Sequence, residues 1–454
     1  MKRPATTASM ILAVLLTLTA CGGGTPAPAG EATSTAAAET QESVTEGASD
    51  SETTQAPEET EVTEETTKKA KKNKHEIKIE QDITSLSEYF AGDFKVGTAL
   101  TPNEMLSRNV MALVNKHFSD SLTCGNEMKP DYVLNKADSV VYFKETGDDT
   151  NPQVSFTQAK TLLDYCSENH IPMRVHTLVW HSQTPTWFFK EGYDENGEWV
   201  TPEKMTKRME NYIKNYFETL TSLYPDIEFY ACDVVNEAWM ENGSPRTAGQ
   251  REEKPEYSPW VKVYGDNSFI EPAFTFARKY APEGCKLYYN DYNEYMDGKL
   301  AAIKNMALEL KEKGIIDGIG MQSHLDVRTG SDAFPSVAMY NKALDTYAEL
   351  GLDIQVTELD ATIPANSGDK YFEAQAEYYK GIMSSIYAHK DNISALIFWG
   401  VTDDRSWRRD QQPLLFRKDF TAKPAFYSIV GIKEEAQTAE SETAGESEDE
   451  VQDD

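Results

Sequence analysis

Eight short apolar runs recur between residues 76 and 433, and each is followed by polar residues and then by a helical stretch. Several runs are continuously apolar rather than alternating, which is typical of parallel strands covered by helices. Eight strand–helix units in about 360 residues favour a closed (β/α)8 barrel over an open doubly wound sheet. We therefore predict an α/β fold with a single (β/α)8 TIM barrel. Its strands are expected at Phe94–Ala99, Ser121–Cys124, Pro172–Trp180, Glu228–Asn236, Lys286–Asn290, Gly318–His324, Asp353–Glu358 and Ala395–Gly400.

The helical stretches between these runs are amphipathic. The clearest is Lys204–Leu223, and its apolar side chains recur at three- and four-residue steps on one face, as expected of a helix packed on the core. They are Met205, Met209, Tyr212, Ile213, Tyr216, Phe217 and Leu220. Gly314 and Gly351 are expected to end two further helices, Ala301–Lys313 and Ser336–Leu350.

The first 21 residues have the pattern of an export signal. Lys2 and Arg3 precede an apolar run from Met10 to Thr19, which is about half the length that a membrane-spanning helix needs. The segment ends in Leu-Thr-Ala-Cys and resembles a bacterial lipobox, which implies cleavage before Cys21 and a lipid on its sulfur. We expect an exported protein anchored to the bacterial membrane through Cys21. An ordinary secretory signal and a secreted protein are the alternative.

Two segments outside the barrel carry most of the charge. The linker from 22 to 75 is rich in Thr, Ser, Glu and Pro and is predicted to be disordered, as is the acidic tail from 434 to 454. Residues 22–66 hold eleven acids and residues 434–454 hold ten, both without a base, so together they account for 21 of the 31 net negative charges. This acidity makes nucleic acid an unsuitable partner. The lysine cluster between 68 and 74 is either a solvated linker end or a contact for an anionic membrane or wall polymer.

Four cysteines remain after Cys21, namely Cys124, Cys166, Cys232 and Cys285. Their spacings match no metal motif, and the sequence leaves three possible disulfide pairings and four free thiols equally open.

Polar and aromatic side chains follow the predicted strands, where a barrel places its reactive groups. They are Asn126 and Lys129 after the second, His176, Trp180, His181 and Gln183 at the third, Asn236 and Glu237 at the fourth, Asn290, Asp291 and Tyr292 at the fifth, Gln322 and His324 at the sixth, Glu358 and Asp360 at the seventh, and Trp399 and Trp407 at the eighth. Amides and acids bind hydroxyl groups, and indoles stack on pyranose rings. The set therefore indicates a carbohydrate site.

Glu237 and Glu358 each end an apolar run, where a carboxylate is partly desolvated and hard to explain by structure alone. The fourth and seventh strands face one another across a barrel mouth. Glycoside hydrolysis requires such a pair, with one carboxyl protonated to donate to the leaving oxygen and one ionised to attack the anomeric carbon.

Other chemistries have little support. The sequence has no G-x-S-x-G elbow, no H-E-x-x-H motif and no P-loop lysine. The stretch 290–298 departs from a calcium loop at Tyr295 and Met296. His176, His181 and His324 lack the short spacing of a metal site. We expect neither a metal nor another cofactor.

Six blocks together resemble glycoside hydrolase family 10, the retaining endo-β-1,4-xylanases, over residues 76–433. They are HTLVWHSQTP from His176, DVVNEA from Asp233, YYNDYN from Tyr288, GMQSHLD from Gly320, VTELD from Val356 and FWGVTDDRSW from Phe398. The resemblance implies an eight-fold barrel with xylan and xylo-oligosaccharides as partners, and we expect a monomer.

The resemblance also implies roles for individual residues. Glu237 matches the acid/base and Glu358 the nucleophile. Asn236 matches the contact to the sugar 2-hydroxyl, and His324, held by Asp360, is expected to orient Glu358. The remaining matches bind sugar: Lys129, His176, Trp180, Gln322, Trp399 and Trp407 next to the scissile bond, Asn126 and Gln183 one sugar further out, and Tyr292 on the leaving side.

Three positions depart from the family pattern. Gly125 stands where many members have Glu, Val175 where Gly is common, and Cys232 where Trp is usual; no catalytic group is lost. Two alternatives remain: the same mechanism on a β-1,4-glucan, and a non-catalytic sugar-binding lipoprotein.

Overall fold

The computed structural model describes residues 77–249, 256–331, 334–436 and 438. The predicted signal segment (1–21), the predicted linker (22–75) and most of the predicted acidic tail lie outside these residues. Four residues of that tail are described, 434–436 and 438. Among them, Glu434 accepts a hydrogen bond from the Tyr89 hydroxyl (2.7 Å), and Glu435 pairs with Lys380 (2.7 Å). None of the helices in the described ranges combines the length and apolar character that a bilayer crossing requires.

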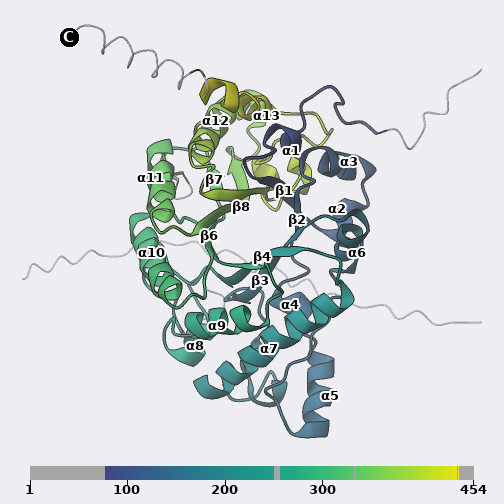
Figure 1. The fold of residues 1–454 in the computed structure, drawn as a ribbon, viewed down its shortest axis with the longest axis vertical. Coiled ribbons are helices and arrows are strands. Elements are labelled where there is room, and N and C mark those ends of the chain that lie inside the picture. The colour runs from purple at the N-terminus through teal and green to yellow at the C-terminus, as the bar shows by residue number, and fades with distance from the viewer. Residues whose placement is uncertain (1–76, 250–255, 332–333, 437, 439–454) are drawn as a thin grey trace, which may run out of the picture. The chain divides into compact units, whose positions relative to one another are not determined.

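Parallel strands close into a barrel at the centre of the domain, with helices around it (Figure 1). The strands are β1 (Lys95–Leu100), β2 (Ser121–Cys124), β3 (Met173–Trp180), β4 (Phe229–Asn236), β5 (Lys286–Asp291), β6 (Gly318–Met321), β7 (His324–Asp326), β8 (Asp353–Thr362) and β9 (Ile393–Phe398). Each of β1 to β5 pairs with the next strand, β6 pairs with β8, β8 with β9, and β9 with β1. The predicted (β/α)8 barrel is therefore confirmed.

The structure corrects two predicted strands. The expected sixth strand is interrupted between β6 and β7, because Ser323 adopts a left-handed conformation (φ 56°). β7 then pairs only with the far end of β8, where His324 lies opposite Asp360. This pairing prolongs β8 to Thr362, so Glu358 lies within a strand rather than at its end.

Helices surround the barrel (Figure 1). They are α1 (Leu86–Tyr89), α2 (Pro102–Met105), α3 (Arg108–His117), α4 (Pro130–Val133), α5 (Lys136–Thr146), α6 (Lys160–Asn169), α7 (Pro202–Leu223), α8 (Pro259–Tyr264), α9 (Ile270–Tyr280), α10 (Asp297–Glu312), α11 (Val337–Ala348), α12 (Phe372–Ala388) and α13 (Pro424–Ile429). α7 begins at a Thr201 N-cap followed by proline, and the whole predicted apolar face is buried. Gly314 and Gly351 have positive φ after α10 and α11, as expected of helix ends.

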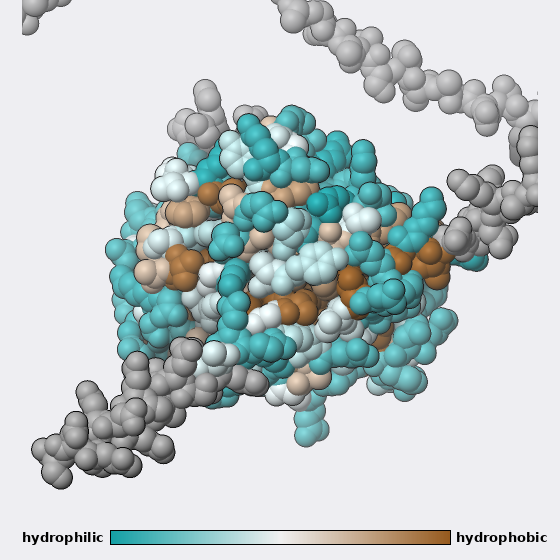
Figure 2. Space-filling model, turned by 90° about the horizontal axis from the view of Figure 1, so that it is seen from above, coloured by the Kyte–Doolittle hydropathy of each residue, from teal (hydrophilic) through white to brown (hydrophobic). Residues whose placement is uncertain are grey.

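Most of the surface on the face seen in Figure 2 is hydrophilic, with smaller hydrophobic areas between hydrophilic ones.

The four described cysteines are buried free thiols, so of the alternatives left open by the sequence the structure shows four free thiols and no disulfide among them.

A buried ion pair fills part of the barrel interior. Arg174 donates two hydrogen bonds to Asp233 (2.6 and 3.0 Å) and a third to Gln355 (2.7 Å). Gln355 in turn donates to the Tyr288 hydroxyl (2.9 Å). These contacts link β3, β4, β5 and β8 below the barrel mouth.

Candidate active site

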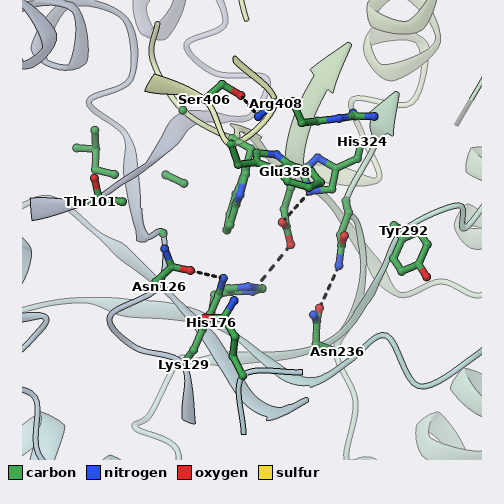
Figure 3. A pocket seen from close by; sticks show the side chains of 18 of the residues that line it. Thr101, Asn126, Lys129, His176, Asn236, Tyr292, His324, Glu358, Ser406 and Arg408 are labelled. Carbon is green, nitrogen blue, oxygen red and sulfur yellow. Dashed lines mark hydrogen bonds and ion pairs between the residues drawn. The ribbon is translucent and has the colours of Figure 1, made fainter. Parts of the chain in front are cut away.

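The carboxyl ends of the strands open into a cleft of about 810 Å³ (Figure 3). Most of the site residues predicted from the sequence line this cleft: Asn126, Lys129, His176, Trp180, Gln183, Asn236, Glu237, Tyr292, Gln322, His324, Glu358, Trp399 and Trp407. His181, Asn290 and Asp291, which also follow predicted strands, do not line it. Asp360 does not line it either, because it is buried behind His324.

Glu237 directly follows β4 and is held from several sides. Its backbone is left-handed (φ 56°), and its amide donates to the Asn290 carbonyl (2.9 Å). Its carboxyl accepts hydrogen bonds from Trp180 (2.9 Å), Asn236 (3.0 Å) and Gln322 (2.9 Å). The Arg246 guanidinium lies 3.9 Å away. The carboxyl is thus fixed in orientation while it still borders the cleft.

Glu358 is buried among groups that favour its charge. Asn290 donates to one carboxyl oxygen (2.8 Å), and the His324 ring nitrogen Nε2 lies 3.2 Å from the other. Burial alone raises the pKa of Glu358, but His176, His324 and Lys129 outweigh it and lower that pKa from 4.5 to about 2. Glu358 is therefore a carboxylate across the physiological pH range.

His324 is held in a cationic state by carboxylates on both sides. Its Nδ1 lies 3.2 Å from Asp360. Burial lowers the pKa of His324, but Asp360 and Glu358 outweigh burial and raise it to about 10. Asp360 also accepts hydrogen bonds from Trp407 (3.1 Å) and Arg408 (2.8 Å). The row of charges therefore alternates from Arg408 through Asp360 and His324 to Glu358.

Three amide side chains connect the two glutamates. Gln322 donates to both Glu237 (2.9 Å) and Asn236 (3.2 Å), and Asn290 donates to both Asn236 (2.9 Å) and Glu358 (2.8 Å). The two carboxyls, which come from opposite sides of the barrel, are thus placed relative to one another by a continuous hydrogen-bond network.

A lysine and two indoles form the adjacent part of the cleft. The Lys129 ammonium lies 5.1 Å from the centre of the Trp180 ring and 5.8 Å from that of Trp399, and it donates to Asn126 (2.9 Å) (Figure 3). Burial lowers the pKa of Lys129, although Glu358 and Glu237 act against this. The surface offers ring faces and hydrogen-bonding groups together, which suits a sugar.

Several residues that support this site were not predicted from the sequence. Asp233 holds the His176 ring (2.9 Å) as well as Arg174. Arg246 and Arg408 contact Glu237 and Asp360 from loops. Asp233 lies in the block DVVNEA, so a charged residue inside an apolar strand was an available signal; the loop arginines gave none.

The positions that depart from the family pattern lie on the cleft wall or in the core. Gly125 lines the cleft, and a Cβ atom there would lie 3.1 Å from Thr101 Cγ2. Val175 and Cys232 are fully buried. Among the described residues, no group of three His, Cys, Asp or Glu side chains is arranged to hold a metal.

Two carboxyls joined by amides at the mouth of a (β/α)8 barrel are the arrangement that glycoside hydrolysis requires. The model of Glycosyl hydrolase family 10 matches residues 85–432, and the chain belongs to that family.

Relatives of known name are similar over the same region. The chain is 42% identical over 360 residues to endo-1,4-beta-xylanase Y of Acetivibrio thermocellus, covering 76% of this chain and 32% of the relative. It is 41% identical over 348 residues to the bifunctional endo-1,4-beta-xylanase XylA of Ruminococcus flavefaciens, covering 77% and 34%. The chain thus spans about a third of the length of these curated relatives.

A solved structure shows the same fold. The N-terminal endo-1,4-beta-D-xylanase 10B of Clostridium thermocellum, in complex with xylohexaose, matches with a TM-score of 0.70 and 39% identity, over 77% of this chain and 67% of that one.

Proposed function

We propose that this protein is a retaining endo-1,4-β-xylanase that hydrolyses internal β-1,4-xylosidic bonds of xylan by double displacement. The observation that carries the proposal is the contrast between the two bridged glutamates. Glu358 is surrounded by cationic groups that keep it ionised, whereas Glu237 borders the cleft and accepts hydrogen bonds from neutral side chains, with the Arg246 guanidinium farther away at 3.9 Å. The names of the relatives and the xylohexaose held by the solved structure support xylan as the polymer.

In the first step, the Glu358 carboxylate attacks the anomeric carbon while Glu237 gives its proton to the glycosidic oxygen. The bond from carbon to the leaving oxygen breaks, the shortened chain departs with a hydroxyl, and the sugar remains bound to Glu358 as an ester. Asn236 is placed to hydrogen-bond the 2-hydroxyl during this step.

In the second step, Glu237, now a carboxylate, takes a proton from water as that water attacks the anomeric carbon. The ester bond to Glu358 breaks, the product leaves as the β-anomer, and both glutamates return to their starting states. His324, fixed by Asp360, keeps Glu358 oriented throughout.

The rest of the cleft binds the polymer. Lys129, His176, Trp180, Gln322, Trp399 and Trp407 hold the sugar at the reacting bond, Asn126 and Gln183 hold the next sugar, and Tyr292 contacts the leaving side. No metal or cofactor enters the reaction.

Proton NMR of a xylan digest during its opening minutes tests the proposal, with carboxymethylcellulose run in parallel. We expect β-anomer products from xylan alone. α-Anomer first would overturn the assignment of Glu358 as nucleophile, and cleavage of only the cellulose derivative would replace the substrate by a β-1,4-glucan. Inactivity of folded protein on both would favour a sugar-binding lipoprotein.

Matched variants test the two roles. Glu358→Ala is expected to abolish turnover of xylan. Glu237→Gln should lose xylan hydrolysis, yet it should still release a good leaving group in the first step, because that step then needs little acid assistance. Glu104→Gln is the control: this buried glutamate lies in the cleft wall, but its carboxyl accepts hydrogen bonds from the Thr101 backbone and hydroxyl (2.8 Å each) and, among the described residues, contacts neither proposed catalytic glutamate. Equal losses in all three variants would contradict the assignment.

We further propose export and attachment to the bacterial membrane through a lipid on Cys21, with residues 22–75 as a disordered spacer and 434–454 as a solvated acidic tail. The catalytic domain then works outside the cytoplasm as a monomer. Labelled fatty acid should enter the wild type but not Cys21→Ala, and loss of the label without a change in membrane association would refute the anchor. Sedimentation of the processed protein tests the monomer.

A further inference from the structure

The link between β6 and β7 carries contacts to both proposed catalytic glutamates. It consists of Gln322 and Ser323, and His324 follows at the start of β7. The Gln322 side chain donates to Glu237 (2.9 Å), and the His324 ring contacts Glu358 (3.2 Å). Ser323 lies between them in a left-handed conformation that costs free energy in a residue other than glycine. Whatever holds Ser323 in place therefore sets both contacts at once.

Ser323 is held by a buried carboxyl and a buried phenol that the proposed mechanism does not use. Its hydroxyl lies 3.2 Å from Glu294 Oε1 and 2.7 Å from the Tyr340 hydroxyl of α11. Glu294 follows β5 by three residues, and it is fully buried, as are Ser323 and Tyr340. The Tyr347 hydroxyl of α11 fixes the Glu294 backbone carbonyl (2.9 Å).

The surroundings of Glu294 favour its neutral form. Its second oxygen, Oε2, is buried and has no hydrogen-bond partner among the described residues. Burial raises the pKa of Glu294 to about 7, and the Asp291 carboxylate raises it as well, while Lys299 acts in the opposite direction. Lys299 is itself engaged by Asp291 (3.0 Å) and the Tyr292 carbonyl (2.9 Å), and so does not reach Glu294 as a partner. The titratable groups around Glu294 are Asp291 and Lys299, with Tyr295, Tyr340, Tyr347 and Tyr378.

We propose that Glu294 is a positioning residue for the reaction: as a neutral carboxyl against Ser323 it fixes the link between β6 and β7, and thereby orients Gln322 on Glu237 and His324 on Glu358 together. This inference rests on the proposed function.

Ionisation of Glu294 would leave a buried charge with one unpaired oxygen beside Ser323. An uncompensated buried carboxylate is costly, so the segment is expected to shift toward arrangements that expose or solvate it. Because Gln322 and His324 adjoin Ser323, both glutamates lose their partners in the same event. Loss of activity on the alkaline side should therefore follow the titration of Glu294.

The test measures kcat and KM for dinitrophenyl β-xylobioside from about pH 5 to about pH 9. This leaving group needs little acid assistance, so kcat/KM does not depend on proton donation by Glu237 and reports other groups of the free enzyme. For the wild type we expect kcat/KM to fall as the pH rises through about 7. Glu294→Gln keeps a neutral, isosteric side chain and should move that limb upward by about one pH unit or more.

Glu294→Ala removes the support for Ser323, and kcat at about pH 6 should fall about tenfold or more while KM changes less than about twofold. The inference would be overturned if kcat/KM of Glu294→Gln fell at the same alkaline pH as in the wild type, or if Glu294→Ala kept the kcat of the wild type. If Glu294→Ala does not fold, Tyr340→Phe replaces it, with Tyr230→Phe as its control. Each variant loses one buried hydrogen bond between a tyrosine and a serine hydroxyl, to Ser323 (2.7 Å) in the first and to Ser121 (2.8 Å) in the second. Only Tyr340→Phe should lower kcat; equal kcat values in the two overturn the inference.

The same measurements distinguish an error in the proposed function from an error in the positioning role of Glu294. A folded wild type that cleaves neither this substrate nor xylan refutes the proposed function. An active wild type whose profile does not respond to position 294 refutes only the positioning role.

Discussion

Replacing Asp360 with Asn tests how the site keeps its proposed nucleophile ionised. The change preserves the shape of the side chain but removes the buried charge that lies 3.2 Å from His324 Nδ1. Without it, Glu358 alone opposes the effect of burial at His324. The pKa of His324 is therefore expected to fall from about 10, far enough to leave the ring largely neutral at physiological pH. Glu358 consequently loses a cationic hydrogen-bond partner.

The expected size follows from the surroundings of Glu358. Its pKa lies at about 2 instead of 4.5, which corresponds to about 3 kcal/mol in favour of the carboxylate. A hydrogen bond to a charged group contributes about 1.5–3 kcal/mol. Neutral His324 should therefore raise the pKa of Glu358 by about one to two, to between about 3 and 4.

The assay is kcat/KM for xylan as a function of pH on the acid side, with circular dichroism at each pH to confirm that the protein is folded. In the wild type, Glu358 should produce no acid limb above about pH 3, whereas Asp360→Asn should show one between about pH 3 and pH 4. Since the folded pKa is depressed, the stability that Glu358 contributes is present above about pH 4.5 and lost as the pH falls toward 2. In Asp360→Asn, the folded pKa of Glu358 lies closer to 4.5, so Glu358 should contribute less stability and lose it over a narrower pH range.

Asp326→Asn is the matched control. Like Asp360, Asp326 is buried, and it lies in β7, two residues from His324. Its carboxylate pairs with Arg328 and accepts a hydrogen bond from the Thr362 hydroxyl (2.9 Å). We expect its acid limb to match the wild type. An unchanged limb in Asp360→Asn, or an equal shift in the control, would refute the electrostatic account.

Two further changes test the barrel itself. Arg174→Met leaves Asp233 as a fully buried carboxylate without its cation, so the free energy of unfolding measured in urea should fall by about 3–5 kcal/mol. Arg278→Met, which breaks a surface pair, is the control and should cost less than about 1 kcal/mol. A small loss in both variants would show that the buried pair contributes little. Gly318→Ala places a Cβ atom 2.2 Å from the Tyr288 ring and should lower thermal stability by about 1–3 kcal/mol; an unchanged melting temperature would show that the ring can move aside.

The order of strands and helices could be predicted from the sequence. Continuous apolar runs indicate strands buried on both faces, and the apolar stripe of α7 marks its buried face, because local periodicity follows directly from which side of an element meets the core. Polar residues after apolar runs identified the cleft, since parallel strands of a barrel place their carboxyl ends at one mouth. Glu237 and Glu358 were found in this way.

The tertiary structure alone decided how those side chains are held. The sequence predicted one sixth strand, but a left-handed Ser323 divides it, and that conformation depends on Glu294 and Tyr340. Glu358 proved to lie within β8, because β7 pairs with the far end of that strand.

The same holds for the network beneath the site. Arg174 binds Gln355, a residue 181 positions away, and Asn290 binds Glu358, 68 positions away. Such contacts have no local period, because they arise only when the barrel closes and brings distant strands within hydrogen-bonding distance. The sequence by itself therefore determined which groups are available for chemistry, whereas closure of the barrel determined their orientation and charge.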